Sequence, residues 1–127
     1  MKSKTYPRQA VYAATGCYQQ LIYSWRGKGP LALSYGPRLP LSEALALDVA
    51  RMLSRFSAPK RISLGAGSAA AAVADRDRPG FLAIWRSGST WNHSVVPEPT
   101  AVAGKIVILL DLGIIKAELL EKLNDAA

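Results

Sequence analysis

Residues 42–56, with the sequence SEALALDVARMLSRF, carry the clearest structural signal in the chain. Apolar side chains recur there at steps of three and four residues, the spacing of one face of an α-helix. These side chains are Leu45, Val49, Met52, Leu53 and Phe56. The hydroxyl group of Ser42 can cap the first turn, and Pro59 cannot continue a helix. The sequence therefore predicts a helix that buries this apolar face.

Strand signals follow toward the C-terminus. Residues 81–86 and 91–96 are rich in aromatic and branched side chains and flank Ser87-Gly88-Ser89-Thr90, a pattern typical of a β-hairpin. Residues 105–112 contain a run of successive aliphatic side chains, which predicts a strand buried on both faces in the centre of a sheet. A final helix is expected over residues 114–124. Its inward side chains are expected to be Ile115, Leu119, Leu120 and Leu123.

Between these elements lies a pair of glycines. Residues 61–64 are expected to form a short strand that leads into Gly65-Ala66-Gly67, and Ser68 is expected to cap an alanine-rich helix. Glycines between a strand and a helix are typical of loops that bind phosphate groups through bare backbone amides. The alternative is a tight turn in which the small residues only permit close packing.

The region before residue 36 allows two interpretations. Tyrosine, tryptophan and branched aliphatic residues favour three strands, over residues 10–14, 18–26 and 31–35. Apolar residues in the same region also fit helical spacing, so a helix from Pro7 to Trp25 is the alternative. We favour strands, because Gly16 interrupts the helical pattern.

Helices and strands in this mixed order predict one α+β domain over residues 1–127. We expect a mixed or antiparallel sheet of about five to six strands with two to three helices packed on it. Half of the 127 residues are apolar, as in globular proteins. The single cysteine, Cys17, excludes an internal disulfide. No apolar stretch approaches the length of a membrane span, so we expect a cytoplasmic protein.

Positive charge is concentrated in the first half of the chain. Residues 1–60 carry nine Lys and Arg against two Asp and Glu, whereas residues 61–127 carry seven of each kind. Such an asymmetry attracts anions, among them nucleic acid, acidic protein surfaces and phosphorylated ligands. Residues 1–8 are expected to be a flexible basic lead-in.

The first candidate site is a basic and aromatic face in this half. Arg26 and Lys28 lie at a predicted hairpin tip, Arg38 lies in the next loop, and Tyr23 and Trp25 lie on the adjoining strand. Cations can contact phosphates while exposed rings stack on bases. We therefore predict a non-enzymatic binding domain for an anionic partner, with nucleic acid as the first candidate. The alternative is that the rings belong to the core.

Two other functions stay open. One is a protein–protein interaction, including a homodimer, through the aromatic residues and the leucine-rich final helix. The other is a small-molecule site or an enzyme, which requires the fold to bring the second set of candidates into one pocket. This set comprises Gly65, Gly67, Ser68, Trp91 and His93.

Signals for catalysis, metals and cofactors are weak. His93 and Cys17 are the only residues of their kinds, and a Cys–His pair would require the fold to bring them together. Asp75 and Asp77 are the only close pair of carboxylates, and arginines alternate with them, which is typical of a solvated helix end rather than a cation site. We expect no metal and no cofactor, and we leave enzymatic activity open.

Overall fold

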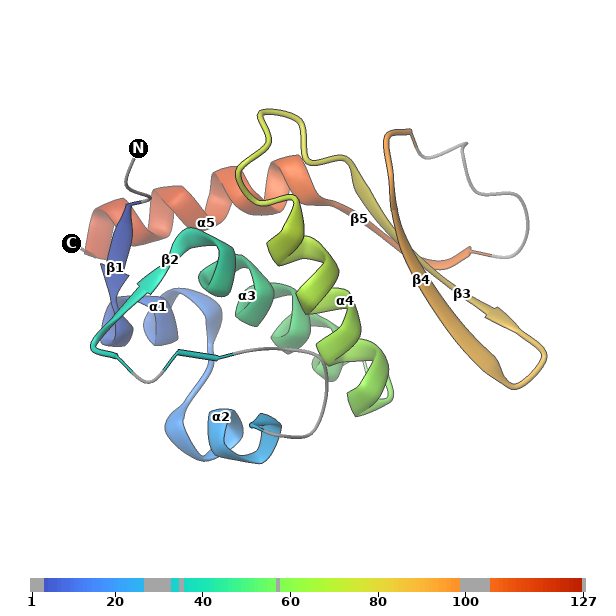
Figure 1. Cartoon of the computed structure of the whole chain (residues 1–127), viewed down its shortest axis with the longest axis horizontal. Helices are drawn as coiled ribbons and strands as arrows, with labels where there is room; N and C mark the ends of the chain where they lie inside the picture. Colours follow the sequence, from blue (N-terminus) through green and yellow to red (C-terminus); the bar gives the residue numbers. More distant parts are fainter. Residues whose placement is uncertain (1–3, 27–32, 35, 57, 99–105, 127) are drawn as a thin grey trace.

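Five helices and five strands form the described part of the computed structural model, which comprises residues 4–26, 33–34, 36–56, 58–98 and 106–126 (Figure 1). The helices are α1 (Arg8–Thr15), α2 (Gln19–Trp25), α3 (Leu41–Arg55), α4 (Lys60–Ala72) and α5 (Leu112–Ala126). The strands are β1 (Thr5–Pro7), β2 (Arg38–Pro40), β3 (Phe81–Ser87), β4 (Thr90–Val96) and β5 (Ile106–Asp111). The α+β class is confirmed. The strands form two small antiparallel sheets, β1-β2 and β4-β3-β5, rather than one sheet covered by two to three helices.

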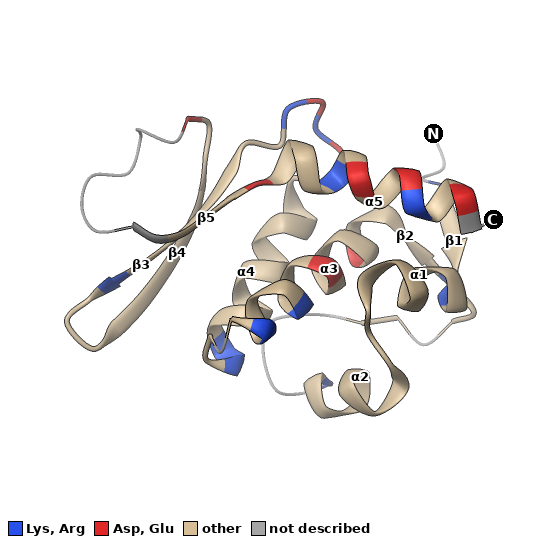
Figure 2. Ribbon diagram, turned by 180° about the vertical axis from the view of Figure 1, so that it is seen from behind, with Lys and Arg blue, Asp and Glu red and all other residues tan. Residues whose placement is uncertain are grey.

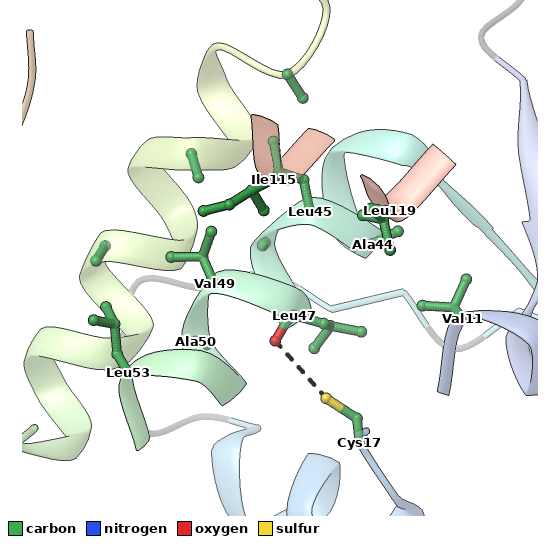
Figure 3. Close-up of a cluster of buried hydrophobic side chains, with 14 of the residues drawn as sticks. Val11, Cys17, Ala44, Leu45, Leu47, Val49, Ala50, Leu53, Ile115 and Leu119 are labelled. Carbon is green, nitrogen blue, oxygen red and sulfur yellow. Dashed lines mark hydrogen bonds between the residues drawn. The ribbon is translucent and has the colours of Figure 1, made fainter. Parts of the chain in front are cut away.

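Helix α3 lies at the centre of the fold. It contacts α1, α4 and α5, and the three-stranded sheet extends to one side of this helical part (Figure 1). Leu45, Val49 and Leu53 are fully buried on α3, and Figure 3 shows Ile115 of α5 next to Leu45. Burial of this many aliphatic side chains is the main stabilising contribution to the fold.

The predicted helix at residues 42–56 is confirmed, with two differences. It begins at Leu41, and Pro40 rather than Ser42 is the residue that precedes its first turn, with no side-chain cap. The reason is that β2 runs directly into α3, so the pairing of Leu39 with Tyr6 sets the entry of the chain. Phe56, the last residue of the predicted apolar face, is 65% exposed beyond the end of α3.

The predicted strands in the N-terminal region are wrong, because residues 8–25 form α1 and α2. Gly16 does not exclude helices. It ends α1 in the left-handed conformation, at φ +76°, and its N–H bonds the carbonyl of Tyr12 at 2.9 Å. In the expected third strand, Leu33 and Ser34 are described and are not in a strand, and its other residues lie outside the described residues. Within the expected flexible lead-in, Thr5–Pro7 form β1, which pairs with β2, so this part of the expectation is wrong.

Helix α4 replaces the predicted strand, glycine turn and helix cap around residues 61–68. It continues through Gly65-Ala66-Gly67, so Ser68 lies inside a helix. A side chain at position 67 would place its Cβ atom 2.7 Å from the carbonyl oxygen of Ala46 on α3. The glycine therefore permits close packing of two helices. The alternative interpretation was right about close packing and wrong about a turn, because the segment is helical.

The predicted hairpin is confirmed as β3 and β4, with Gly88 at φ +61° in the turn. The expected last strand exists as β5, but it lies at the edge of the sheet beside the central β3, and Leu109 is 39% exposed. The final helix is also confirmed, although it begins at Leu112. None of the described helices is long and apolar enough to cross a membrane.

Candidate functional site

Positive side chains occur at the end of α2, on the second half of α3 and on the first turn of α4, a region that we call the basic corner. Figure 2 shows Lys and Arg on these segments, whereas α5 carries both acidic and basic side chains. The five cations of the basic corner are Arg26, Arg51, Arg55, Lys60 and Arg61. No Asp or Glu occurs from residue 49 to residue 74, the stretch that supplies four of these five cations, so its net charge is positive.

Exposed aromatic rings accompany these cations. Tyr18, Tyr23 and Phe56 are 49%, 56% and 65% exposed. The guanidinium carbon of Arg51 lies 5.8 Å from the centroid of the Tyr18 ring, and that of Arg26 lies 5.3 Å from the Tyr23 ring. Both distances are within the range of a cation–π contact. Cations and aromatic faces therefore lie side by side on this surface.

The turn between α1 and α2 contacts two arginines of the basic corner. The Nε of Arg51 donates a hydrogen bond to the carbonyl of Gly16 at 3.2 Å. A Cβ atom at Gly16 would meet the Arg55 guanidinium at 2.7 Å. The turn between the first two helices is thus seated against the basic end of α3.

A cleft between α1 and α2 holds two of the residues that the sequence singled out. Tyr23 and Arg26 line this cleft of about 350 Å³ together with Arg8 and Tyr12. The Arg8 guanidinium donates to the Tyr12 hydroxyl at 2.8 Å and to the carbonyls of Ser34 and Gly36. Because these bonds fasten a loop to α1, Arg8 has a structural role here.

The other predicted anion-binding residues do not join this surface as expected. Trp25 is only 3% exposed, since it shares the buried face of α2 with Ile22, and it is not available for stacking. Arg38 donates to the side chain and the carbonyl of Thr5, at 2.9 and 2.8 Å, and so ties β2 to β1. Lys28 lies outside the described residues.

Sequence reasoning did not place four cations of the corner, Arg51, Arg55, Lys60 and Arg61, in the site. The available signal was the run of residues 49–74 without a carboxylate, which spans the end of one helix and the start of the next.

A second cavity of about 310 Å³ adjoins the corner between α1, α3 and α5. Arg51, Arg55 and Lys122 line it together with the carboxyl group of Asp48. Burial, with a smaller contribution from the charge of Glu118, raises the pKa of Asp48 to about 6, although Lys122 and Arg55 act in the opposite direction. This carboxyl group is the acidic component of a cavity that otherwise carries cations.

The fold brings together only three of the five residues predicted for a small-molecule site. Gly65, Trp91 and His93 line one hollow of about 430 Å³ between α4 and β4. A Cβ atom at position 65 would lie 2.8 Å from Nε2 of His93. Burial lowers the pKa of His93 from its ordinary value of 6.5, so the imidazole is neutral at pH 7. Gly67 faces α3 instead, and Ser68 does not line this hollow.

The remaining chemical groups give little support to catalysis. The thiol of Cys17 is buried and lies 3.8 Å from the carbonyl oxygen of Leu47 (Figure 3). Burial raises the pKa of this thiol, which leaves it protonated and a poor nucleophile. Among the residues that the structure describes, no three His, Cys, Asp or Glu side chains are placed to hold a metal ion.

No protein-family model matches this sequence, and neither the curated proteins nor the solved structures provide a significant match.

Proposed function

We propose that the protein is a non-enzymatic binding domain for nucleic acid and that the basic corner is its binding surface. The observation that carries the proposal is that five cations and three exposed rings lie on α2, its flanking residues, the end of α3 and the start of α4. In this proposal Tyr23 and Arg26 belong to the binding surface, as the sequence predicted, and Arg51, Arg55, Lys60 and Arg61 supply the other cations.

The two kinds of side chain act on different parts of the ligand. Lys and Arg contact phosphates and release counterions, which gives affinity at low salt without reading the sequence. Exposed rings stack on unpaired bases, at about 1–3 kcal/mol for each base. An acidic protein surface would engage the cations but has no bases for Tyr18 and Tyr23 to stack on, so the rings favour nucleic acid.

The proposal is tested with two double variants that change the net charge equally. K60E/R61E alters the basic corner at the start of α4, where acidic residues suit the helix dipole and the fold is expected to tolerate them. R76E/R78E alters two exposed arginines in the loop before β3. Binding to a labelled single-stranded oligonucleotide is measured by fluorescence anisotropy.

We expect K60E/R61E to lose affinity and to reduce the slope of log K against log salt by about 1.4, because each phosphate that a cation neutralises adds about 0.7 to this slope for single strands. R76E/R78E is expected to lose much less affinity and to keep the wild-type slope. Equal losses of affinity in both variants would show that only the net charge matters, and a wild-type protein that does not bind at low salt would refute the proposal.

A further inference from the structure

A groove lies between the start of α4 and the facing strand β4, next to the basic corner. Two adjoining hollows of about 430 and 310 Å³ form it, and Arg61, Ile62 and Trp91 line both of them. Gly65 and His93 belong to the first hollow. Volumes of this size are typical of sites for small organic ligands.

Trp91 gives the groove a flat apolar wall. Its side chain is half-buried and packs against the edge of the hydrophobic core. Arg86 pairs with Trp91 across the strands, and its guanidinium carbon lies 5.7 Å from the centroid of the indole ring. Exposed Arg61 lies on the opposite wall, with Lys60 beside it in the chain. A ligand with both a planar ring and a negative group matches these side chains.

His93 and Gly65 form the other part of the wall. Since a Cβ atom at position 65 would collide with the imidazole, glycine is what lets this ring rest on α4. Nδ1 of His93 is buried and has no hydrogen-bond partner among the described residues. An interior helical glycine and an unpartnered buried nitrogen both cost stability, and such costs concentrate at functional sites.

We propose that this groove holds one unpaired nucleobase, which stacks on Trp91 while its phosphate meets Arg61. The inference rests on the proposed function for its ligand, because Arg61 connects the groove to the basic corner. A base within a duplex is stacked between its neighbours and must be extruded before it can enter such a site. The groove therefore selects single-stranded nucleic acid. A free nucleotide carries the same ring and phosphate, so the test separates the two sources.

The sole histidine makes the test specific. Because His93 is the only histidine in the sequence, its imidazole C–H signals are assigned directly in a proton NMR spectrum. The wild-type protein is titrated separately with a nucleoside monophosphate, with inorganic phosphate and with a single-stranded oligonucleotide. We expect the monophosphate and the oligonucleotide to shift the His93 signals saturably, and inorganic phosphate to leave them unchanged.

A pair of tryptophan variants locates the ring. W91L retains apolar bulk but removes the indole face, and we expect it to weaken monophosphate binding at least about fivefold. W85L is the matched control, because Trp85 is also half-buried on the hairpin but pairs with Asn92 on the other face of the sheet. It is expected to bind as the wild-type protein does.

The outcomes distinguish the groove from the basic corner. Oligonucleotide binding that leaves the His93 signals unmoved would overturn the groove proposal and leave the proposed function standing. A shift caused by inorganic phosphate alone would also overturn it, since the ring would then be unnecessary. Monophosphate binding at His93 without oligonucleotide binding would support the groove and refute the proposed function.

Discussion

Gly67 shows how one residue fixes the packing of two neighbouring helices. It lies where α4 crosses α3, with the Ala46 carbonyl oxygen 2.7 Å and the Ala50 Cβ 3.4 Å from the position that a new Cβ atom would take. The nearer of these atoms belongs to the backbone of a buried helix, so it cannot move aside as a flexible side chain would. Glycine is therefore required here by the neighbouring helix.

Gly67→Ala is expected to lower the free energy of unfolding by about 1–3 kcal/mol through overpacking, although alanine favours helices by about 1 kcal/mol. Denaturant unfolding measures this change. Gly113→Ala in the first turn of α5 is the control, because its new Cβ atom would meet only the flexible side chain of Asp111, at 3.2 Å. Equal effects of the two substitutions would contradict the packing role of Gly67.

Asp48 gives a second prediction at the residue scale. Its pKa is raised from 3.8 to about 6 by burial, so below pH 3.8 it is protonated in both the folded and the unfolded chain. As the pH rises toward 6, the unfolded chain loses its proton first, and stability falls. Asp48→Asn removes this decrease and is expected to raise the melting temperature at pH 7 but not near pH 3.5. A constant difference at both pH values would contradict the prediction.

At the scale of single elements, local patterns predicted some segments well. The apolar face of α3, the hairpin turn at Gly88 and the aliphatic spacing of α5 are each encoded within a few neighbouring residues. Other segments depend on distant contacts. Helix α4 has small residues instead of a broad apolar face, and its close packing on α3 is visible only in the fold.

The secondary-structure predictions that were wrong failed for physical reasons. Helices α1 and α2 have eight and seven residues, which is too short for helical spacing to outweigh a β-like aromatic composition. The aliphatic run in β5 suggested burial on both faces, yet the strand lies at a sheet edge with Leu109 partly exposed. Of the candidate site, Tyr23 is exposed as predicted, whereas Trp25 is buried because of how α2 docks, which the sequence does not show.

The exposed rings of Tyr18 and Tyr23, just before and within α2, give a prediction for this element. Y18A/Y23A is expected to weaken binding to a single-stranded oligonucleotide about tenfold or more, because the bases can no longer stack on these rings. The salt slope should stay unchanged, since no cation is removed. Y18F/Y23F retains both rings and is the control. An affinity as low in the phenylalanine variant as in the alanine variant would exclude stacking as the role of these rings.

For the whole molecule, the distribution of charge was predictable and its location was not. The sequence places the excess of Lys and Arg before residue 61. Only the fold shows that Arg51 and Arg55 line one cavity together, while Arg38 joins β2 to β1. Sequence distance does not determine this grouping, because the turn at Gly16 and the loop after α3 decide which cations become neighbours.

The salt dependence of binding tests the central claim most directly. The association constant of the wild-type protein for a single-stranded oligonucleotide is measured between about 50 and 200 mM salt. If four or five cations of the basic corner contact phosphates, log K falls linearly with log salt, with a slope of about −3. Binding that does not change with salt, or no binding at the lowest salt concentration, would contradict nucleic-acid recognition by this corner.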